Sequence, residues 1–68
     1  MVEVFKTNIA DNKEAERIEK LLLLLFPDSR INFDLQDCDK VLRIEGKISM
    51  KTVIDLVTTC QYECEVLE

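Results

Sequence analysis

Three cysteines, Cys38, Cys60 and Cys64, are the residues of this chain best suited to nucleophilic chemistry or to binding a soft metal. The chain contains no histidine, so no imidazole can activate a thiol or complete a metal site. Cys60 and Cys64 fall on the apolar sides of two periodic segments, where free cysteine behaves as a small hydrophobic residue. Cys38 stands between two aspartates in an expected turn, so we expect its thiol to be exposed. An odd number of cysteines also favours reduced thiols over a disulfide framework.

Asp11 and Glu14 form the second group with chemical potential, because two carboxylates separated by two residues at a helix start could face one cation. Asn12 could add a carbonyl oxygen, but three oxygens are few for calcium or magnesium. The same spacing suits helix capping, in which an acidic N-cap and a glutamate three residues later satisfy free N–H groups and complement the helix dipole. We expect the capping role for both residues and keep a metal site at Asp11 and Glu14 as the alternative.

The charge balance narrows the classes of partner. Nine lysines and arginines against fourteen aspartates and glutamates give the 68 residues a formal charge of −5, which repels nucleic acid and anionic membrane surfaces. The longest apolar run, Leu21 to Phe26, is too short to span a bilayer and is placed wrongly for a signal peptide. We therefore expect a soluble cytoplasmic protein with no cofactor, no nucleic-acid partner and no membrane contact.

Leu23 and Leu24 are the least explained apolar residues. The stripe expected to face the core recurs at steps of three and four: Ala15, Ile18, Leu22 and Leu25. Leu23 and Leu24 fall outside it and should be partly exposed, and with Phe26 they form a candidate contact patch for a protein partner or a weak homodimer. The edge of the strand at 31–35 is a second route to association, although Asn32 and Asp34 would oppose strand pairing.

The periodic segments that position these residues predict one α+β domain over 1–68. Period-two alternation indicates strands at 2–6, 31–36, 41–45 and 62–66, and period-3.6 patterns indicate helices ending at Phe26 and covering 50–60. Two amphipathic helices in the order βαββαβ must cover the same side of one sheet, as in a ferredoxin-like sandwich. We expect a four-stranded antiparallel or mixed sheet, with the first and third strands adjacent and parallel in its centre.

The length, the element order and two short stretches resemble the heavy-metal-associated domain family of copper chaperones and metal-ATPase modules. These stretches are Val4-Phe5-Lys6 with Ala15-Glu16-Arg17-Ile18-Glu19-Lys20-Leu21, and Gln61-Tyr62 leading into the last strand. In that family a Met-x-Cys-x-x-Cys loop opens the first helix and binds a soft metal. Here the two cysteine positions fall on Asp11 and Glu14, and the methionine position falls on Ile9. The resemblance implies the fold but not the thiolate site.

These observations predict a non-enzymatic binding or interaction module with a metal-chaperone-like fold. A protein that handles metal through an altered site, using Asp11, Glu14 or the cysteines, is the alternative. A small enzyme such as an acylphosphatase shares the architecture but needs a glycine-rich or arginine-bearing phosphate cradle after the first strand. Residues 7–12 contain neither glycine nor arginine, which argues against that class.

Overall fold

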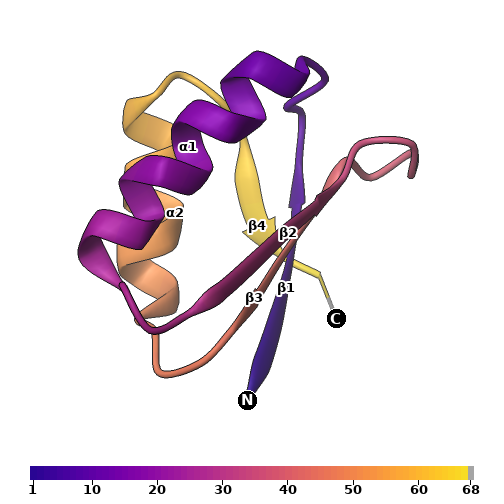
Figure 1. Cartoon of the computed structure of the whole chain (residues 1–68). Coiled ribbons are helices and arrows are strands. Elements are labelled where there is room, and N and C mark those ends of the chain that lie inside the picture. The colour runs from indigo at the N-terminus through magenta and orange to yellow at the C-terminus, as the bar shows by residue number, and fades with distance from the viewer. Residues whose placement is uncertain (68) are drawn as a thin grey trace.

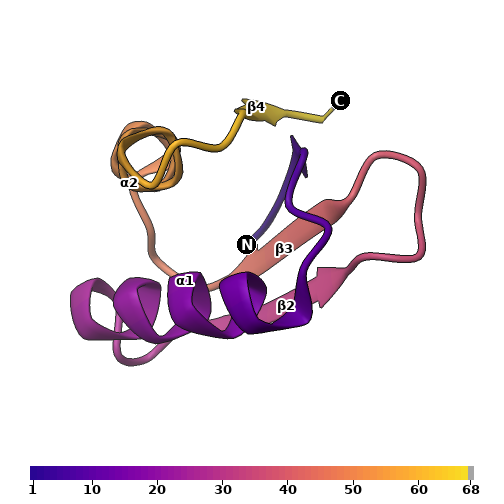
Figure 2. The ribbon, with the colours of Figure 1, turned by 90° about the horizontal axis from the view of Figure 1, so that it is seen from above.

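The computed structural model describes residues 1–67 as an α+β domain in the predicted order βαββαβ (Figure 1). The elements are β1 (Val2–Thr7), α1 (Asn12–Leu25), β2 (Arg30–Asp34), β3 (Val41–Glu45), α2 (Met50–Thr59) and β4 (Cys64–Val66). Both helices lie on one side of the sheet, as Figure 2 shows. The ferredoxin-like arrangement predicted from the sequence is confirmed.

The four strands follow the order β2-β3-β1-β4, with β2 and β4 at the edges as predicted. Every neighbouring pair is antiparallel, so the expectation that the first and third strands run parallel is wrong. The reason lies in the crossovers: α1 joins β1 to β2 and α2 joins β3 to β4, and the members of each joined pair run in the same direction but are not neighbours. β3 lies between β1 and β2 and runs antiparallel to both strands. In the same way, β1 lies between β3 and β4 and runs antiparallel to both.

The core lies between the sheet and the helices. Its fully buried side chains come from every element except β2 and β4 and from the loop after β1: Phe5, Ile9, Ile18, Leu22, Leu42, Ile44, Val53 and Val57. On β1, Phe5 and Thr7 point toward the helices and are buried, whereas Val2 lies on the opposite face of the strand and is exposed. On β3 the predicted alternation is confirmed for buried Leu42 and Ile44 against exposed Arg43 and Glu45, but Val41, predicted on the face of Arg43 and Glu45, is also buried.

The end of α1 departs from the predicted stripe. Ala15, Ile18 and Leu22 are buried, but Leu25 is 51% exposed. The helix ends at Leu25, and Phe26, four positions after Leu22, packs against the core in its place. Neither helix within residues 1–67 is long and apolar enough to cross a membrane.

Candidate functional site

The loop between β1 and α1 is held by hydrogen bonds of Thr7 and Asn8, the residues with which it leaves β1. The Thr7 hydroxyl is buried, donates to the Lys40 carbonyl and accepts from the Ile9 N–H over 3.2 Å. The side-chain oxygen of Asn8 accepts from the Glu63 N–H over 2.8 Å, which ties the loop to the segment before β4. Ile9, in the middle of the loop, is fully buried. The loop is therefore held by the fold itself.

Asp11 is the N-cap of α1, as predicted. Its backbone is extended, and its Oδ1 accepts a hydrogen bond from the Lys13 N–H over 2.8 Å. The Ala15 N–H donates to the Asp11 carbonyl over 3.0 Å, which closes the first turn. One carboxylate oxygen thereby satisfies a helix N–H that has no partner inside the helix.

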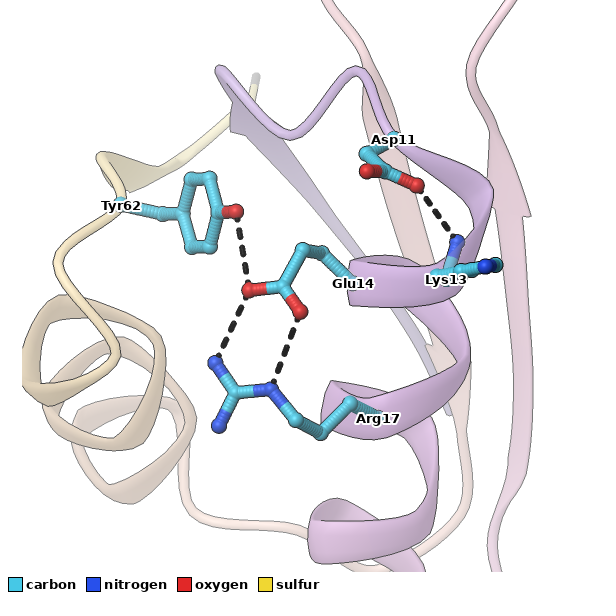
Figure 3. A network of polar contacts seen from close by, with 5 residues as sticks. All are labelled: Asp11, Lys13, Glu14, Arg17 and Tyr62. Atoms are coloured by element: carbon cyan, nitrogen blue, oxygen red, sulfur yellow. Dashed lines mark hydrogen bonds and ion pairs between the residues drawn. The ribbon is translucent and has the colours of Figure 1, made fainter.

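Glu14 forms the centre of a polar network rather than the second half of a capping box (Figure 3). Arg17 donates to both carboxylate oxygens, from Nε over 3.2 Å and from Nη2 over 3.0 Å, and the Tyr62 hydroxyl donates to Oε1 over 3.1 Å. The hydrogen bonds from Arg17 and then from Tyr62 hold the pKa of Glu14 below its ordinary value. Desolvation and the neighbouring Glu14 carboxylate raise the pKa of Tyr62, so the tyrosine remains a donor at neutral pH.

The two carboxylates therefore point to different partners. Figure 3 shows Asp11 directed at the backbone of Lys13, and Glu14 directed at Arg17 and Tyr62. A cation between Asp11 and Glu14 would have to displace the helix cap on one side and a charged guanidinium on the other. The geometry favours the capping and bracing roles over the cation site.

The cysteines lie in different parts of the molecule. Cys60 and Cys64 are partly buried and pack against the core, as expected of small hydrophobic residues. Burial, followed by the nearby Glu65 charge, raises the pKa of the Cys64 thiol to about 11, so that thiol is a weak nucleophile at neutral pH. Cys38 is exposed in the β2–β3 loop.

Cys38, one of the cysteines of the alternative metal-handling prediction, lies between two acidic residues that were not part of that prediction. One ligand atom each from Asp37, Cys38 and Asp39 lies within 4.8 Å of the others. Two of these side chains already have partners: Asp37 Oδ1 accepts from the Asp39 N–H over 2.9 Å, and Asp39 Oδ1 lies 3.8 Å from Lys6 Nζ. The group is an ordinary Asx turn with a salt bridge at its base.

The three residues of the predicted contact patch, Leu23, Leu24 and Phe26, differ in their exposure. Leu24 is 79% exposed, Leu23 is half-buried, and Phe26 is partly buried against the core. Leu25, predicted to face the core, is exposed beside Leu24. The exposed apolar surface at the end of α1, called here the α1-end surface, consists of Leu24 and Leu25.

Tyr62 is the residue of this site that sequence reasoning missed. Arg17 lies three residues after Glu14, a spacing that brings side chains together on a helix and could have been used. Tyr62 comes from the far end of the chain and reaches Glu14 only because α2 and β4 place it beside α1. No local pattern in the sequence signals that contact.

Among solved structures, the chain is similar to one described as "Crystal structure of Gold binding protein". The TM-score is 0.82, and the alignment covers 96% of this chain and 98% of that one. Sequence identity is 12%, so the likeness shows a common fold. No protein-family model matches the sequence, and neither does any curated protein.

Proposed function

We propose that this chain is a non-enzymatic interaction module that keeps a metal-chaperone-like fold and uses the position of the metal loop as a structural brace. The observation that carries the proposal is the state of Glu14, whose two carboxylate oxygens are engaged by Arg17 and Tyr62. A residue that replaces a thiolate ligand here connects α1 to the β4 end of the molecule instead of presenting a free donor atom.

The surroundings of the thiols support a non-enzymatic role. The sequence offers no histidine to act as a base for Cys38, Cys60 or Cys64. The raised pKa of the Cys64 thiol keeps it protonated at neutral pH.

The α1-end surface supports a protein as the partner. Leu24 and Leu25 expose 79% and 51% of their surface at adjacent positions. Exposed apolar residues that lie next to one another, and not singly, are the kind of surface that protein partners cover. The net charge of −5 works against nucleic acid and anionic lipid as partners.

Titration with Cu(I) and Zn(II) against a competing chelator tests the loss of the thiolate site. The reduced parent is expected to show no stoichiometric binding in the sub-micromolar range, because a stable soft-metal site needs converging thiolates or imidazoles. The variant Asp11→Cys/Glu14→Cys restores the family's ligand pair and is expected to bind Cu(I). Tight stoichiometric binding by the parent would contradict the proposal.

The second candidate function is metal-ion handling through a non-standard site, and the group at Asp37, Cys38 and Asp39 is the observation that favours it. The structural neighbour, described as a gold binding protein, has the same fold. If the parent binds metal and Cys38→Ser does not, this second function is the correct one. The existing bonds of Asp37 and Asp39 make it the weaker candidate.

A further inference from the structure

We propose that two copies of this chain pair antiparallel through the outer edge of β2, about a two-fold axis at Asn32, to form one sheet that continues across both copies. β2 is the outermost strand of the sheet (Figure 2), and no strand of the described chain lies beyond it. This edge shares no residue with the Glu14 network or with the α1-end surface.

The hydrogen bonds of the sheet determine which backbone groups face the open edge. The Met1 carbonyl accepts from the Gly46 N–H over 2.9 Å, so Met1 and Gly46 are a hydrogen-bonded pair where β1 begins and β3 ends. Successive residues of a strand direct their N–H and C=O groups to opposite sides, so every second pair along the two strands is hydrogen-bonded. Glu3 and its partner Ile44 therefore bond to each other across β1 and β3. Arg43, the neighbour of Ile44, bonds on the other side of β3, toward β2.

Arg43 lies opposite Asn32, so the backbone of Asn32 bonds inward to β3. Ile31 and Phe33, on either side of Asn32, then direct their N–H and C=O groups outward, away from the sheet. In an antiparallel pair centred on Asn32, Ile31 of one copy lies opposite Phe33 of the other, and both residues present outward groups. The register thus satisfies the pairing geometry at both positions.

The side chains of β2 are self-complementary in this register. The strand reads Arg30-Ile31-Asn32-Phe33-Asp34, so reversal about Asn32 brings arginine opposite aspartate and isoleucine opposite phenylalanine. The Arg30–Asp34 pairs fall at non-hydrogen-bonded positions, where facing side chains are closest. Two-fold symmetry forms each pair twice.

Dimerisation would give the Asp34 carboxylate an oppositely charged neighbour, which it does not have within the described part of its own sheet. It is exposed, lies opposite Val41, and forms no ion pair within residues 1–67. A shift of the register so that the axis falls on Ile31 or Phe33 places Arg30 or Asp34 opposite Asn32 and loses both charge pairs. Arg30 and Asp34 would lie opposite unmatched side chains in most other strands. In a second copy of β2 each lies opposite its counter-charge, so the two charges favour self-pairing.

The apolar residues of the edge are accessible to such a partner. Ile31 and Phe33 are half-buried and line an open groove between α1 and β2. In the paired arrangement each would be covered by the other residue of the second copy. Cross-strand pairs of an aromatic with a β-branched residue stabilise antiparallel sheets.

Exchange of the two charges tests the proposal in solution. Sedimentation velocity over a concentration series reaching millimolar, at physiological salt, is expected to show a weak dimer. Arg30→Asp and Asp34→Arg, which each place like charges opposite, should weaken dimerisation by about tenfold or more. An equimolar mixture of the two variants should restore it, because each strand then faces its opposite charge. The double exchange Arg30→Asp/Asp34→Arg should also restore the homodimer.

Matched controls carry the same charge changes elsewhere. Lys51→Asp and Asp55→Arg lie on exposed positions of α2 and should leave the dimer unchanged. Native circular dichroism is required of every variant, and the double exchange decides the matter if a single variant is unfolded. In the parent, the amide protons of Ile31 and Phe33 should become protected from exchange as concentration rises.

Three results would overturn the proposal. One is a parent that stays monomeric at millimolar concentration. The second is a dimer that is indifferent to the charge exchanges at Arg30 and Asp34. The third is a dimer abolished by Leu24→Lys, with the Ile31 and Phe33 amides unprotected, which would place the contact at the α1-end surface.

Discussion

The hydroxyl of Tyr62 donates a hydrogen bond to Oε1 of Glu14 over 3.1 Å, although the two residues lie 48 positions apart in the sequence. The same carboxylate accepts both hydrogen bonds from Arg17. One glutamate thereby connects the first turns of α1 to the segment that leads into β4.

Removal of the Tyr62 hydroxyl should raise the pKa of Glu14. Arg17 is the larger cause of the lowered pKa and Tyr62 the second, so Arg17→Met should raise it more than Tyr62→Phe. A carboxylate with a lowered folded-state pKa contributes stability that is present above its unfolded pKa and is lost as pH falls. The NMR titration of the Glu14 side-chain carboxyl gives the order directly.

Acid unfolding provides the control for this prediction. The parent should lose more stability than Tyr62→Phe as pH falls through the range in which Glu14 titrates. If Glu14 titrates identically in the parent and in Tyr62→Phe, the hydrogen bond has no electrostatic consequence and the bracing role is wrong.

Cys64 should make the fold sensitive to alkali. Its thiol ionises near 9.0 when free and near 11 in the fold, so the unfolded state loses its proton first as pH rises. The stability contributed by the protonated thiol is therefore complete below pH 9 and falls between pH 9 and 11. Denaturant unfolding at a series of pH values should show a smaller alkaline loss in Cys64→Ala than in the parent.

The raised pKa of Tyr62 acts in the same direction and must be separated from that of Cys64. The comparison of Cys64→Ala with its parent is therefore repeated in a Tyr62→Phe background. If the free energy of unfolding falls equally with pH in Tyr62→Phe and in Cys64→Ala/Tyr62→Phe, the burial of Cys64 does not affect its ionisation.

Asp11→Ala should destabilise the protein by about 0.5–2 kcal/mol, the usual cost of removing an N-cap side chain. The Lys13 N–H loses its acceptor, while Glu14 keeps its own partners. Asp11→Asn keeps an acceptor at the cap and should recover most of the loss. Calcium or magnesium should leave the melting temperature of the parent unchanged, and a rise in the parent that is absent from Asp11→Ala would show a cation site.

Most of the fold could be predicted because it depends on local periodicity. Leu42 and Ile44 alternate with charged residues, and Ile18 and Leu22 recur at helical spacing, so each segment defines its own buried face. The direction of β1 relative to β3 follows from the element order and not from periodicity: α1 returns the chain so that β1 and β2 run in the same direction, and β3 is antiparallel to β2 and therefore to β1. Leu25 was misplaced because periodicity does not show where the helix gives way to the turn at Phe26.

In the candidate site, too, local contacts could be predicted from the sequence and long-range contacts could not. The cap at Asp11 follows from neighbours in the sequence, and the structure confirms it. The Tyr62 contact depends on the packing of three elements, which no segment of the sequence encodes alone. The self-complementarity of Arg30 and Asp34 is visible in the sequence, and the edge position of that segment was predicted, but the register that directs the Ile31 and Phe33 backbone groups outward comes from the structure.

Leu24→Lys should remove a protein contact without weakening the fold. Leu24 is 79% exposed, so the substitution should change the free energy of unfolding by no more than about 0.5 kcal/mol. Leu22, two positions earlier, is fully buried, and Leu22→Ala should cost about 2–5 kcal/mol. Immobilised parent protein should capture partners from native lysate that Leu24→Lys does not, as measured by quantitative mass spectrometry.

Thr59→Lys is the matched control, because it adds the same charge at an exposed position near the end of the other helix. It should capture the same proteins as the parent. Leu24→Lys should lose these partners because binding would bury the lysine ammonium group in place of the leucine side chain. Burying that charge costs much free energy unless the partner supplies a counter-charge. Equal capture by the parent and Leu24→Lys would show that the α1-end surface is ordinary solvent-facing helix, and the partner would have to contact another face.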